Sequence, residues 1–227
     1  MPRKIRCIIL DLPHHALQRG NNRQNIFLDS NDKDFFLKQL KKYGHDNKVG
    51  IGAYCIMTNH FHLLIYPRQD EGLIKLMKNI SQIYAQYFNR KYKRSGKIWE
   101  NRYKLNIIEP EYEWVFARYI EKNPVRAGVV LKAETYSYSS AAANLNGKAD
   151  EALTRNIIND RRQEYIEFFN EPEANNDSQL NLLRTIIQQQ KGFGRKEFIE
   201  KLKQKFQVNF EIMPRGRPQK REEVGKK

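Results

Sequence analysis

The chain has 227 residues, which suffices for one full domain with an appendage or for two small domains. Its net charge of +15, from 41 Lys and Arg against 26 Asp and Glu, exceeds what solubility needs and favours a polyanionic partner, most commonly nucleic acid. No apolar run approaches the roughly 20 residues of a membrane helix, and the run at 7–10 is too short for a signal peptide. The two cysteines form no disulfide framework, so we expect a cytoplasmic protein in a reducing compartment.

Hydrophobic periodicity predicts alternating strands and helices in the first half of the chain. A short strand ends at the turn signal Gly20-Asn21-Asn22, and apolar residues at helical spacing follow the capping residues 29–32. Two alternating segments flank the tight turn Thr58-Asn59 and predict a β-hairpin. The expected elements, in chain order, are strand 16–19, helix 31–44, strand 49–57, strand 60–66, helix 71–92, strand 103–108 and a further helix from 111 to about 122.

This order is the βαββαβ pattern of an α+β, ferredoxin-like antiparallel sheet with helices on one face. For a site to form on the sheet, the other face must be left open or be covered by the further helix that begins at 111. Two short amphipathic helices, around Leu183 and Leu202, follow an acidic linker at 171–178, and the last residues show no apolar period, which predicts disorder. The expected parts are a catalytic domain at 1–140, a connecting segment and linker at 141–178, a helical extension at 179–213 and a basic tail at 214–227.

The most informative motif is the run from Asn59 to Ile65, which contains His60 and His62. Successive side chains of a strand point to opposite faces, so His60 and His62 would share one face of an inner strand. Two imidazoles side by side can hold one metal ion. The alternative is a pair of partly buried histidines satisfied by hydrogen bonds, and the spacing alone does not separate the two interpretations.

A second pair, Tyr119 and Asn123, lies four residues apart and would share one face of the helix that begins at 111. A tyrosine can be a nucleophile that forms a covalent intermediate. Its ordinary pKa is about 10, so it needs help to ionise or a strongly activated target, such as a phosphate bound to a metal. The alternative is a core aromatic residue followed by a helix C-cap, and on spacing alone this alternative is favoured.

Together, these motifs resemble the single-tyrosine HUH transposases, and most closely the branch of REP-associated tyrosine transposases. The resemblance rests on His60-Phe61-His62 and on the later run Arg118-Tyr119-Ile120-Glu121-Lys122-Asn123-Pro124-Val125-Arg126-Ala127-Gly128. The chain departs from the family at Thr58, where the family often has proline, in a turn that should not touch the chemistry. Further matches, which extend the resemblance over residues 13–140, are Gln18-Arg19-Gly20-Asn21-Asn22-Arg23, Tyr87-Phe88-Asn89, Trp99-Glu100-Asn101-Arg102-Tyr103 and Tyr136-Ser137-Tyr138-Ser139-Ser140.

The resemblance implies a ferredoxin-like catalytic domain and a defined mechanism. His60 and His62 would hold Mg²⁺ or Mn²⁺, with Asn123 as the third ligand. Tyr119 would attack a phosphate of single-stranded DNA near a hairpin, form a 5′-phosphotyrosine bond and release a 3′-OH, and reversal would rejoin strands. One tyrosine per protomer suits one covalent step, so two strand ends would call for a homodimer. The competing nucleophile candidates, ranked lower because they lack the Asn-Pro-Val-Arg context, are Tyr84, Tyr87 and Tyr112.

Basic residues interleave with aromatic ones between the second expected helix and the fourth strand, which predicts a DNA-binding surface, since Lys and Arg contact phosphates and aromatic rings stack on unpaired bases. The alternative is a solvated loop with core aromatics, and for Trp99 the two interpretations stand equal. In the tail, Arg215-Gly216-Arg217-Pro218 resembles an AT-hook core. The expected DNA-contacting residues are Arg19, Arg23, Arg90, Lys91, Arg94, Lys97, Trp99, Arg102, Arg126, Arg215 and Arg217.

The sequence therefore predicts a metal-dependent, nucleoid-associated transposase that cleaves and rejoins single-stranded DNA near hairpins. Two alternatives remain: a hairpin-binding protein without cleavage activity, and a metal-dependent nuclease whose nucleophile is water. We expect the region from about 179 onward to add DNA affinity rather than catalysis, because it lies beyond the segment that resembles the family.

Overall fold

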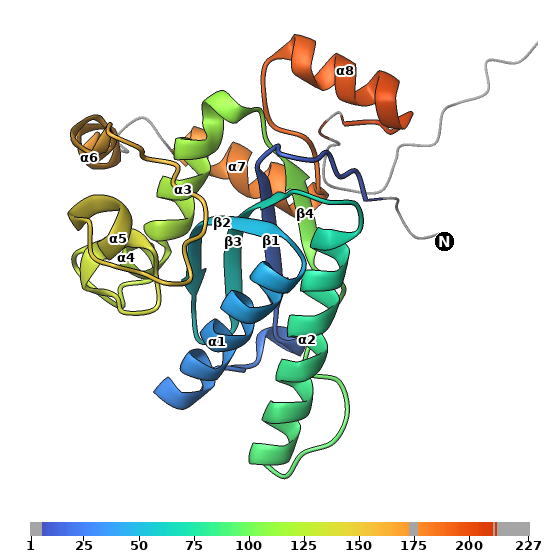
Figure 1. The fold of residues 1–227 in the computed structure, drawn as a ribbon, viewed down its shortest axis with the longest axis vertical. Coiled ribbons are helices and arrows are strands. Elements are labelled where there is room, and N and C mark those ends of the chain that lie inside the picture. Colours follow the sequence, from blue (N-terminus) through green and yellow to red (C-terminus); the bar gives the residue numbers. More distant parts are fainter. Residues whose placement is uncertain (1–5, 173–176, 211, 213–227) are drawn as a thin grey trace, which may run out of the picture.

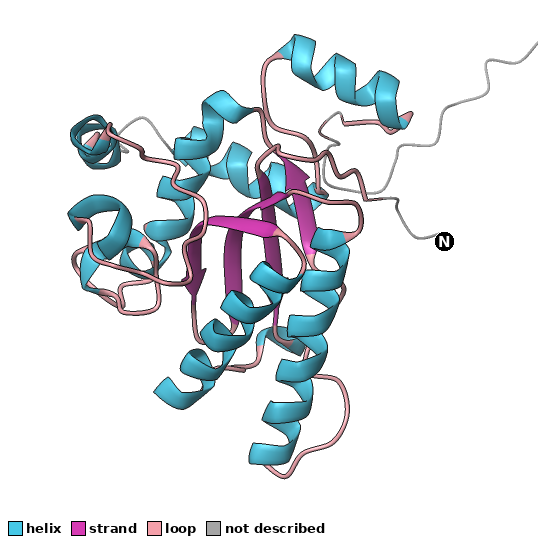
Figure 2. Ribbon diagram, in the orientation of Figure 1, coloured by secondary structure: helices cyan, strands magenta, loops and turns pink. Residues whose placement is uncertain are grey.

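A four-stranded antiparallel sheet forms the centre of the computed structural model, which describes residues 6–172, 177–210 and 212. The strands lie in the order β2-β3-β1-β4 (Figures 1 and 2). This order confirms the predicted ferredoxin-like arrangement, in which the β2–β3 hairpin pairs with β1 and β4 closes the far edge. The strand bounds are β1, His14–Arg19; β2, Val49–Ile56; β3, His60–Pro67; and β4, Lys104–Ile107.

Helices lie on both faces of this sheet (Figure 1). The short 3₁₀ turns are η1, Asn21–Arg23; η2, Pro110–Tyr112; and η3, Ala133–Thr135. The α-helices in the described part of the chain are α1, Ser30–Asp46; α2, Gly72–Lys91; α3, Glu113–Glu121; α4, Asn123–Arg126; α5, Ala141–Asn146; α6, Arg162–Asn170; α7, Asp177–Gln189; and α8, Lys196–Phe206.

One face of the sheet is covered by α1 and α2, which pack side by side (Figure 1). Asp29 caps α1 in a capping box with Asp32, an arrangement that typically stabilises a helix by about 1 kcal/mol. The Nζ of Lys91, at the end of α2, lies 2.7 Å from a carboxylate oxygen of each aspartate. Asp32 is fully buried, so the ion pair ties the end of α2 to the start of α1.

The other face carries α3 and α7. Phe116 and Ile120 of α3 belong to the same buried cluster as Leu64 and Tyr66 of β3. Ile187 of α7 joins this cluster, and α7 lies against β4. The added helix α3 therefore covers the face on which a site was expected, and α7 covers the part of that face nearest the β4 edge.

A buried carboxylate holds α3 in place. Glu121 accepts hydrogen bonds from Ser140 Oγ at 2.6 Å, Asn144 Nδ2 at 2.7 Å and the phenol of Tyr165 at 2.7 Å. Burial raises the pKa of Glu121 above its ordinary value. Because its partners come from α5, α6 and the loop before α5, the second half of the chain fixes the position of α3 and of the residues that it carries.

The predicted elements differ from the observed ones mainly at their ends. The first strand begins two residues earlier than predicted, at His14, and therefore includes His15. The predicted linker 171–178 overlaps the start of α7 at Asp177, and α6 was not predicted. The tail 214–227, with Arg215 and Arg217, lies outside the described residues. Within the described ranges, no helix is both long enough and apolar enough to span a bilayer.

Candidate functional site

The two histidines of the motif lie on one face of β3, as the spacing predicts. Their ring centroids are 5.1 Å apart, and the strand pairs them with Arg19 and Leu17 of β1, respectively. His60 is partly buried at the start of β3, and His62 is only 3 % exposed. The pair therefore sits on a rigid inner strand, with Arg19 beside it.

Both imidazoles are neutral at neutral pH. Burial, with a smaller contribution from Arg19, lowers the pKa of His60 from 6.5 to about 4. Burial also lowers the pKa of His62 well below its ordinary value, helped by the neighbouring imidazoles and by Arg126 and Arg19. A neutral imidazole has one nitrogen with a free electron pair, which is the form that binds a metal.

Tyr119 lies beside these histidines. It comes from α3, and its ring centroid is 5.8 Å from that of His62, with the two planes nearly perpendicular. The side chain is 9 % exposed. The structure therefore brings the predicted nucleophile to the predicted ligand pair, although the two are more than 50 residues apart in the chain.

The charges of three arginines act on the phenol of Tyr119. The guanidinium carbon of Arg126 is 4.6 Å from the ring centroid, within the range of a cation–π contact. Burial raises the pKa of Tyr119, while the charges of Arg126, Arg184 and Arg19 and a hydrogen-bonding interaction with Arg184 oppose that rise. The phenol is thus protonated in the resting protein, because the effect of burial outweighs the effect of the arginine charges.

Asn123 caps the end of α3 with its amide nitrogen. Its Nδ2 donates to the carbonyl oxygens of Tyr119 and Ile120, both at 3.0 Å. This is the C-cap role that the sequence left as an alternative. With the nitrogen engaged in this way, the carboxamide oxygen is the atom of Asn123 that can serve as a metal ligand.

The donor set fits a divalent ion whose remaining ligands come from outside the protein. His60 and His62 offer two nitrogens. The hydrogen bonds of Asn123 go to α3 and not to the histidines, so its oxygen as a third ligand stays a prediction. In the part of the chain that the structure describes, no three or more His, Cys, Asp or Glu residues are placed to hold a metal. A six-coordinate ion such as Mn²⁺ or Mg²⁺ would therefore complete its shell with water and substrate oxygens, as Mg²⁺ commonly does.

The competing tyrosines lie elsewhere. Tyr84 is fully buried on the opposite face of the sheet, where its hydroxyl donates to the carbonyl of Ile26. The hydroxyl of Tyr87 donates to Asp32 at 3.1 Å. Tyr112 belongs to η2, where it packs against Phe193. None of these three contacts the histidine pair in the interactions that the described residues make.

Several residues that were expected to bind DNA have structural partners within the protein. Lys91 makes the ion pairs with Asp29 and Asp32 described above. Trp99 is 8 % exposed, and its Nε1 donates to the carbonyl of Ser81 at 2.9 Å, as in the core interpretation. Lys97 donates to the carbonyl of Glu100, and Arg94 donates to Gln24 at 3.3 Å.

The other expected DNA contacts fall into two groups. Arg19 and Arg126 belong to the site itself. Arg102 just before β4, Arg90 near the end of α2 and Arg23 in η1 are all exposed. Whether these residues contact DNA stays a prediction, as does the role of the region after 179.

Sequence reasoning missed three residues around the site. His15 Nε2 and His62 Nδ1 are 2.8 Å apart, both buried. Asn106 is the cross-strand partner of His15 on β4. Arg184, from α7, lies at Tyr119 and opposes the effect of burial on its pKa. The one available signal was the alternation of His15, Leu17 and Arg19, which would have placed His15 on the face of the histidine motif.

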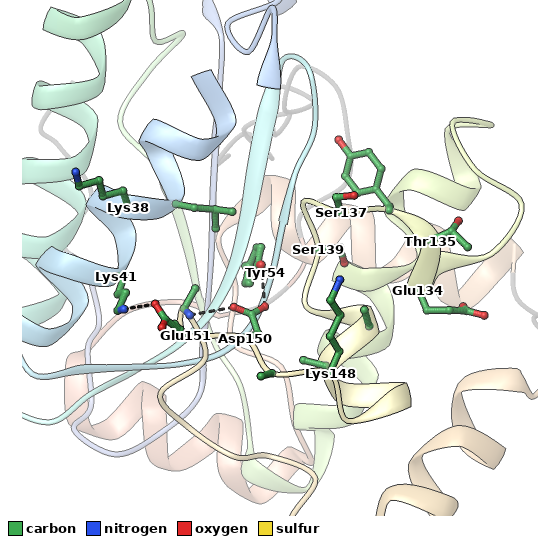
Figure 3. A pocket seen from close by; sticks show the side chains of 16 residues that line it. Lys38, Lys41, Tyr54, Glu134, Thr135, Ser137, Ser139, Lys148, Asp150 and Glu151 are labelled. Carbon is green, nitrogen blue, oxygen red and sulfur yellow. Dashed lines mark hydrogen bonds and ion pairs between the residues drawn. The ribbon is translucent and has the colours of Figure 1, made fainter. Parts of the chain in front are cut away.

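A cavity of about 560 Å³ lies away from this site, between α1, β2 and the segment 134–152 (Figure 3). Two pairs of polar side chains that line it interact with each other. Tyr54 donates to Asp150 at 2.8 Å, and Lys41 forms an ion pair with Glu151. None of the predicted catalytic or metal-binding residues lines this cavity.

Comparison with known proteins bears on the family and the fold of the chain. The family model described as "Transposase IS200 like" matches residues 9–123, about half of the chain. A REP-associated tyrosine transposase, solved bound to a REP hairpin, has a similar fold, with a TM-score of 0.52 and 17 % sequence identity over 69 % of this chain and 93 % of its own. A protein of Deinococcus radiodurans R1 described as a transposase matches with a TM-score of 0.38 and 17 % identity over 53 % of this chain and 97 % of its own. No curated protein matches the chain.

The fold and the site define an α+β protein with a histidine pair and a tyrosine on one face of its sheet. The chain belongs to the IS200-like transposase family. Its function is accordingly that of a transposase, and its partner is DNA.

Proposed function

We propose that this transposase cleaves and rejoins single-stranded DNA near hairpins through a covalent bond between Tyr119 and a 5′-phosphate. The observation that carries the proposal is the convergence of Tyr119 with two neutral imidazoles, at 5.8 Å between the ring centroids of Tyr119 and His62. A phenol nucleophile and a pair of metal ligands are the parts that this reaction requires.

His60, His62 and the carboxamide oxygen of Asn123 would hold Mg²⁺ or Mn²⁺. When bound, the ion would withdraw charge from the scissile phosphate and so make it a better target for a phenol. The two imidazoles contribute by staying neutral, because burial keeps the pKa of His60 at about 4. Each then retains an electron pair for the ion across the physiological pH range.

The chemical step uses the phenol oxygen of Tyr119. A bond forms between this Oη and phosphorus, and the bond between phosphorus and the 3′ oxygen breaks. The 3′ oxygen leaves with the bonding electrons and takes up a proton as a 3′-OH, while the phenol loses its proton. The charges of Arg19, Arg126 and Arg184 favour both the phenolate and the phosphate oxygens. Attack by another 3′-OH reverses the step and joins a new strand, so no high-energy cofactor is needed.

The substrate proposal rests on two observations. The arginines at Tyr119 form a positive site on a chain whose net charge is +15. The similar fold of a transposase solved with a REP hairpin supports hairpin DNA as the ligand. We further propose that the protein is nucleoid-associated and acts as a homodimer when two strand ends are processed, since each protomer supplies one nucleophile.

A denaturing gel with a labelled hairpin oligonucleotide and Mn²⁺ tests the proposal. A 5′-phosphotyrosine bond retains the fragment on the 3′ side of the cut, so a 3′ label should appear on a protein adduct and a 5′ label on a free fragment. Tyr119→Phe should lose the adduct while it still binds the hairpin, and Tyr112→Phe serves as a matched control that should keep it.

The alternatives predict different gels. A nuclease with water as nucleophile would release both fragments without an adduct, and a protein that only binds DNA would leave the oligonucleotide intact. An adduct that persists in Tyr119→Phe would show that another tyrosine is the nucleophile.

A further inference from the structure

His15, on β1, contacts His62, one of the two proposed metal ligands on β3. The Nε2 of His15 and the Nδ1 of His62 are 2.8 Å apart, and the rings are stacked with centroids 5.0 Å apart. His15 is fully buried. Since both imidazoles are neutral, one nitrogen of the pair must carry the hydrogen and the other must accept it. Which one donates decides which nitrogen of His62 is left for a metal.

Asn106 determines the direction of that hydrogen bond. Its Nδ2 donates to the carbonyl oxygens of Ile186 at 2.9 Å and Lys191 at 2.8 Å, which uses both amide hydrogens. A flipped amide would place its oxygen against two carbonyl oxygens, so the orientation of Asn106 is fixed. Its Oδ1 is therefore an acceptor only, and it is buried.

His15 and Asn106 each leave one buried polar atom without a hydrogen-bond partner. His15 and Asn106 are direct partners across β1 and β4. The Nδ1 of His15 and the Oδ1 of Asn106 are both buried, and neither has a hydrogen-bond partner among the described residues, while the side chain of Asn106 acts on His15 in the direction that raises its pKa. A buried pair of this kind is satisfied when the Nδ1–H of His15 donates to the Oδ1 of Asn106. The Nε2 of His15 then has no hydrogen, so the Nδ1–H of His62 must donate to it.

His60 reaches the same tautomer through a separate contact. The Nδ2 of Asn59 donates to the carbonyl of Arg23 at 3.1 Å, which turns the Oδ1 of Asn59 toward the Nδ1 of His60, 2.5 Å away. The Nδ1 of His60 is therefore the protonated nitrogen. Both ligand histidines thus leave Nε2 as the nitrogen with a free electron pair.

We propose that His15, oriented by Asn106, is a positioning residue that holds His62 in the tautomer that binds metal through Nε2. This inference rests on the proposed function, because it assigns a role toward the metal. It also links α7 to the site, since the carbonyls that orient Asn106 belong to Ile186 in α7 and to Lys191 just after it. Hydrogen bonds of this type orient metal-binding histidines, and their loss typically lowers metal affinity by about 10- to 100-fold.

The first test is a long-range ¹H–¹⁵N NMR correlation on the metal-free full-length protein, which reports the tautomer of each neutral histidine. We expect Nδ1–H on His15, His60 and His62. The signals of His15 are assigned by their loss in His15→Leu. A wild-type His62 that carries its hydrogen on Nε2 would overturn the inference.

The second test is calorimetric Mn²⁺ titration of His15→Leu, His15→Gln and His14→Leu. His14 is an equally buried histidine on the same strand that faces the other side of the sheet, so its variant should keep wild-type affinity. His15→Leu should bind Mn²⁺ about 10- to 100-fold more weakly. Gln can donate to Asn106 and accept from His62, so His15→Gln should recover part of the loss, which a purely structural role would not explain.

The two proposals fail in different ways. Wild-type protein that does not bind Mn²⁺ at all would overturn the proposed metal dependence and, with it, the role of His15. Wild-type protein that binds Mn²⁺ with the same affinity as a folded His15→Leu variant would overturn the role of His15 alone.

Discussion

The phenol of Tyr165 donates a hydrogen bond of 2.7 Å to the carboxylate of Glu121, and both side chains are fully buried. The other carboxylate oxygen accepts from Ser140 and Asn144. This one group therefore joins α3, which carries Tyr119, to the two helices α5 and α6.

We expect Glu121→Ala to lower the free energy of unfolding by at least about 2 kcal/mol, because it leaves buried donors without an acceptor. Glu121→Gln should lose less, since it keeps the side-chain volume and one acceptor oxygen. Urea unfolding of the three proteins measures the difference. Equal losses in the two variants would mean that the hydrogen bonds of Glu121 contribute little to stability.

We expect His60→Ala to abolish calorimetric Mn²⁺ binding and cleavage while it changes the melting temperature only slightly. The reason is that His60 lies partly exposed at the start of β3, so its loss removes a ligand and little packing. His45→Ala is a matched control, because His45 is an exposed histidine on α1. Unchanged Mn²⁺ affinity in His60→Ala would show that the histidine pair is structural.

We expect Arg184→Ala to slow cleavage at saturating DNA by up to about 5-fold, since Arg184 is exposed and an exposed charge interaction contributes about 0.2–1 kcal/mol. Arg184 opposes the rise that burial causes in the pKa of Tyr119, so its removal should raise that pKa further. A pH–rate profile should then shift to higher pH. Arg184→Lys keeps the charge and should shift less; identical profiles in all three proteins would exclude a role for this arginine at the phenol.

We expect the protein to lose stability as the pH falls from 6.5 to about 4. Burial lowers the pKa of His14 from 6.5 to about 4 in the folded protein, and it does the same for His15. In this window the unfolded chain takes up protons that the folded chain does not bind, so the free energy of unfolding decreases with decreasing pH. Each unit of pKa difference corresponds to about 1.4 kcal/mol.

His14→Gln tests the contribution of one such group. The Nδ1 of His14 donates to the carbonyl of Leu12 at 2.8 Å, and its Nε2 accepts from the amide of Ile9 at 3.3 Å. Glutamine can donate and accept without titrating, so the variant should lose less stability than wild type between pH 6.5 and about 4. Urea midpoints measured across this window would contradict the prediction if both proteins showed the same slope.

The sequence was sufficient to predict the order of elements and the first contacts of the site. Period-two alternation placed His60 and His62 on one face, and the resemblance to a family identified Tyr119. The first signal is a local pattern and the second is a sequence motif, so both can be seen in the sequence. The structure brings these three residues together.

The remaining contacts depend on packing between distant segments, which periodicity does not encode. His15 lies just outside the predicted strand 16–19, so its face was not assigned. The amphipathic pattern predicted α7 as a helix but not that it would dock on β4 and bring Arg184 to Tyr119. Lys91 was read as a DNA contact because its partner, Asp32, is 59 residues away and meets it only when α1 and α2 pack together.

The carbonyl oxygens that hold Asn106 lie at positions 186 and 191, well past the end of the family match at residue 123. A fragment that ends at residue 140 would keep His60, His62, Tyr119 and Asn123. It would lose the two carbonyl groups that accept hydrogen bonds from Asn106, and it would lose Arg184. Such a fragment would contain every residue of the motifs but would lack the contacts that orient the side chains of the site. The smallest active piece of this chain should therefore extend through the loop that follows α7.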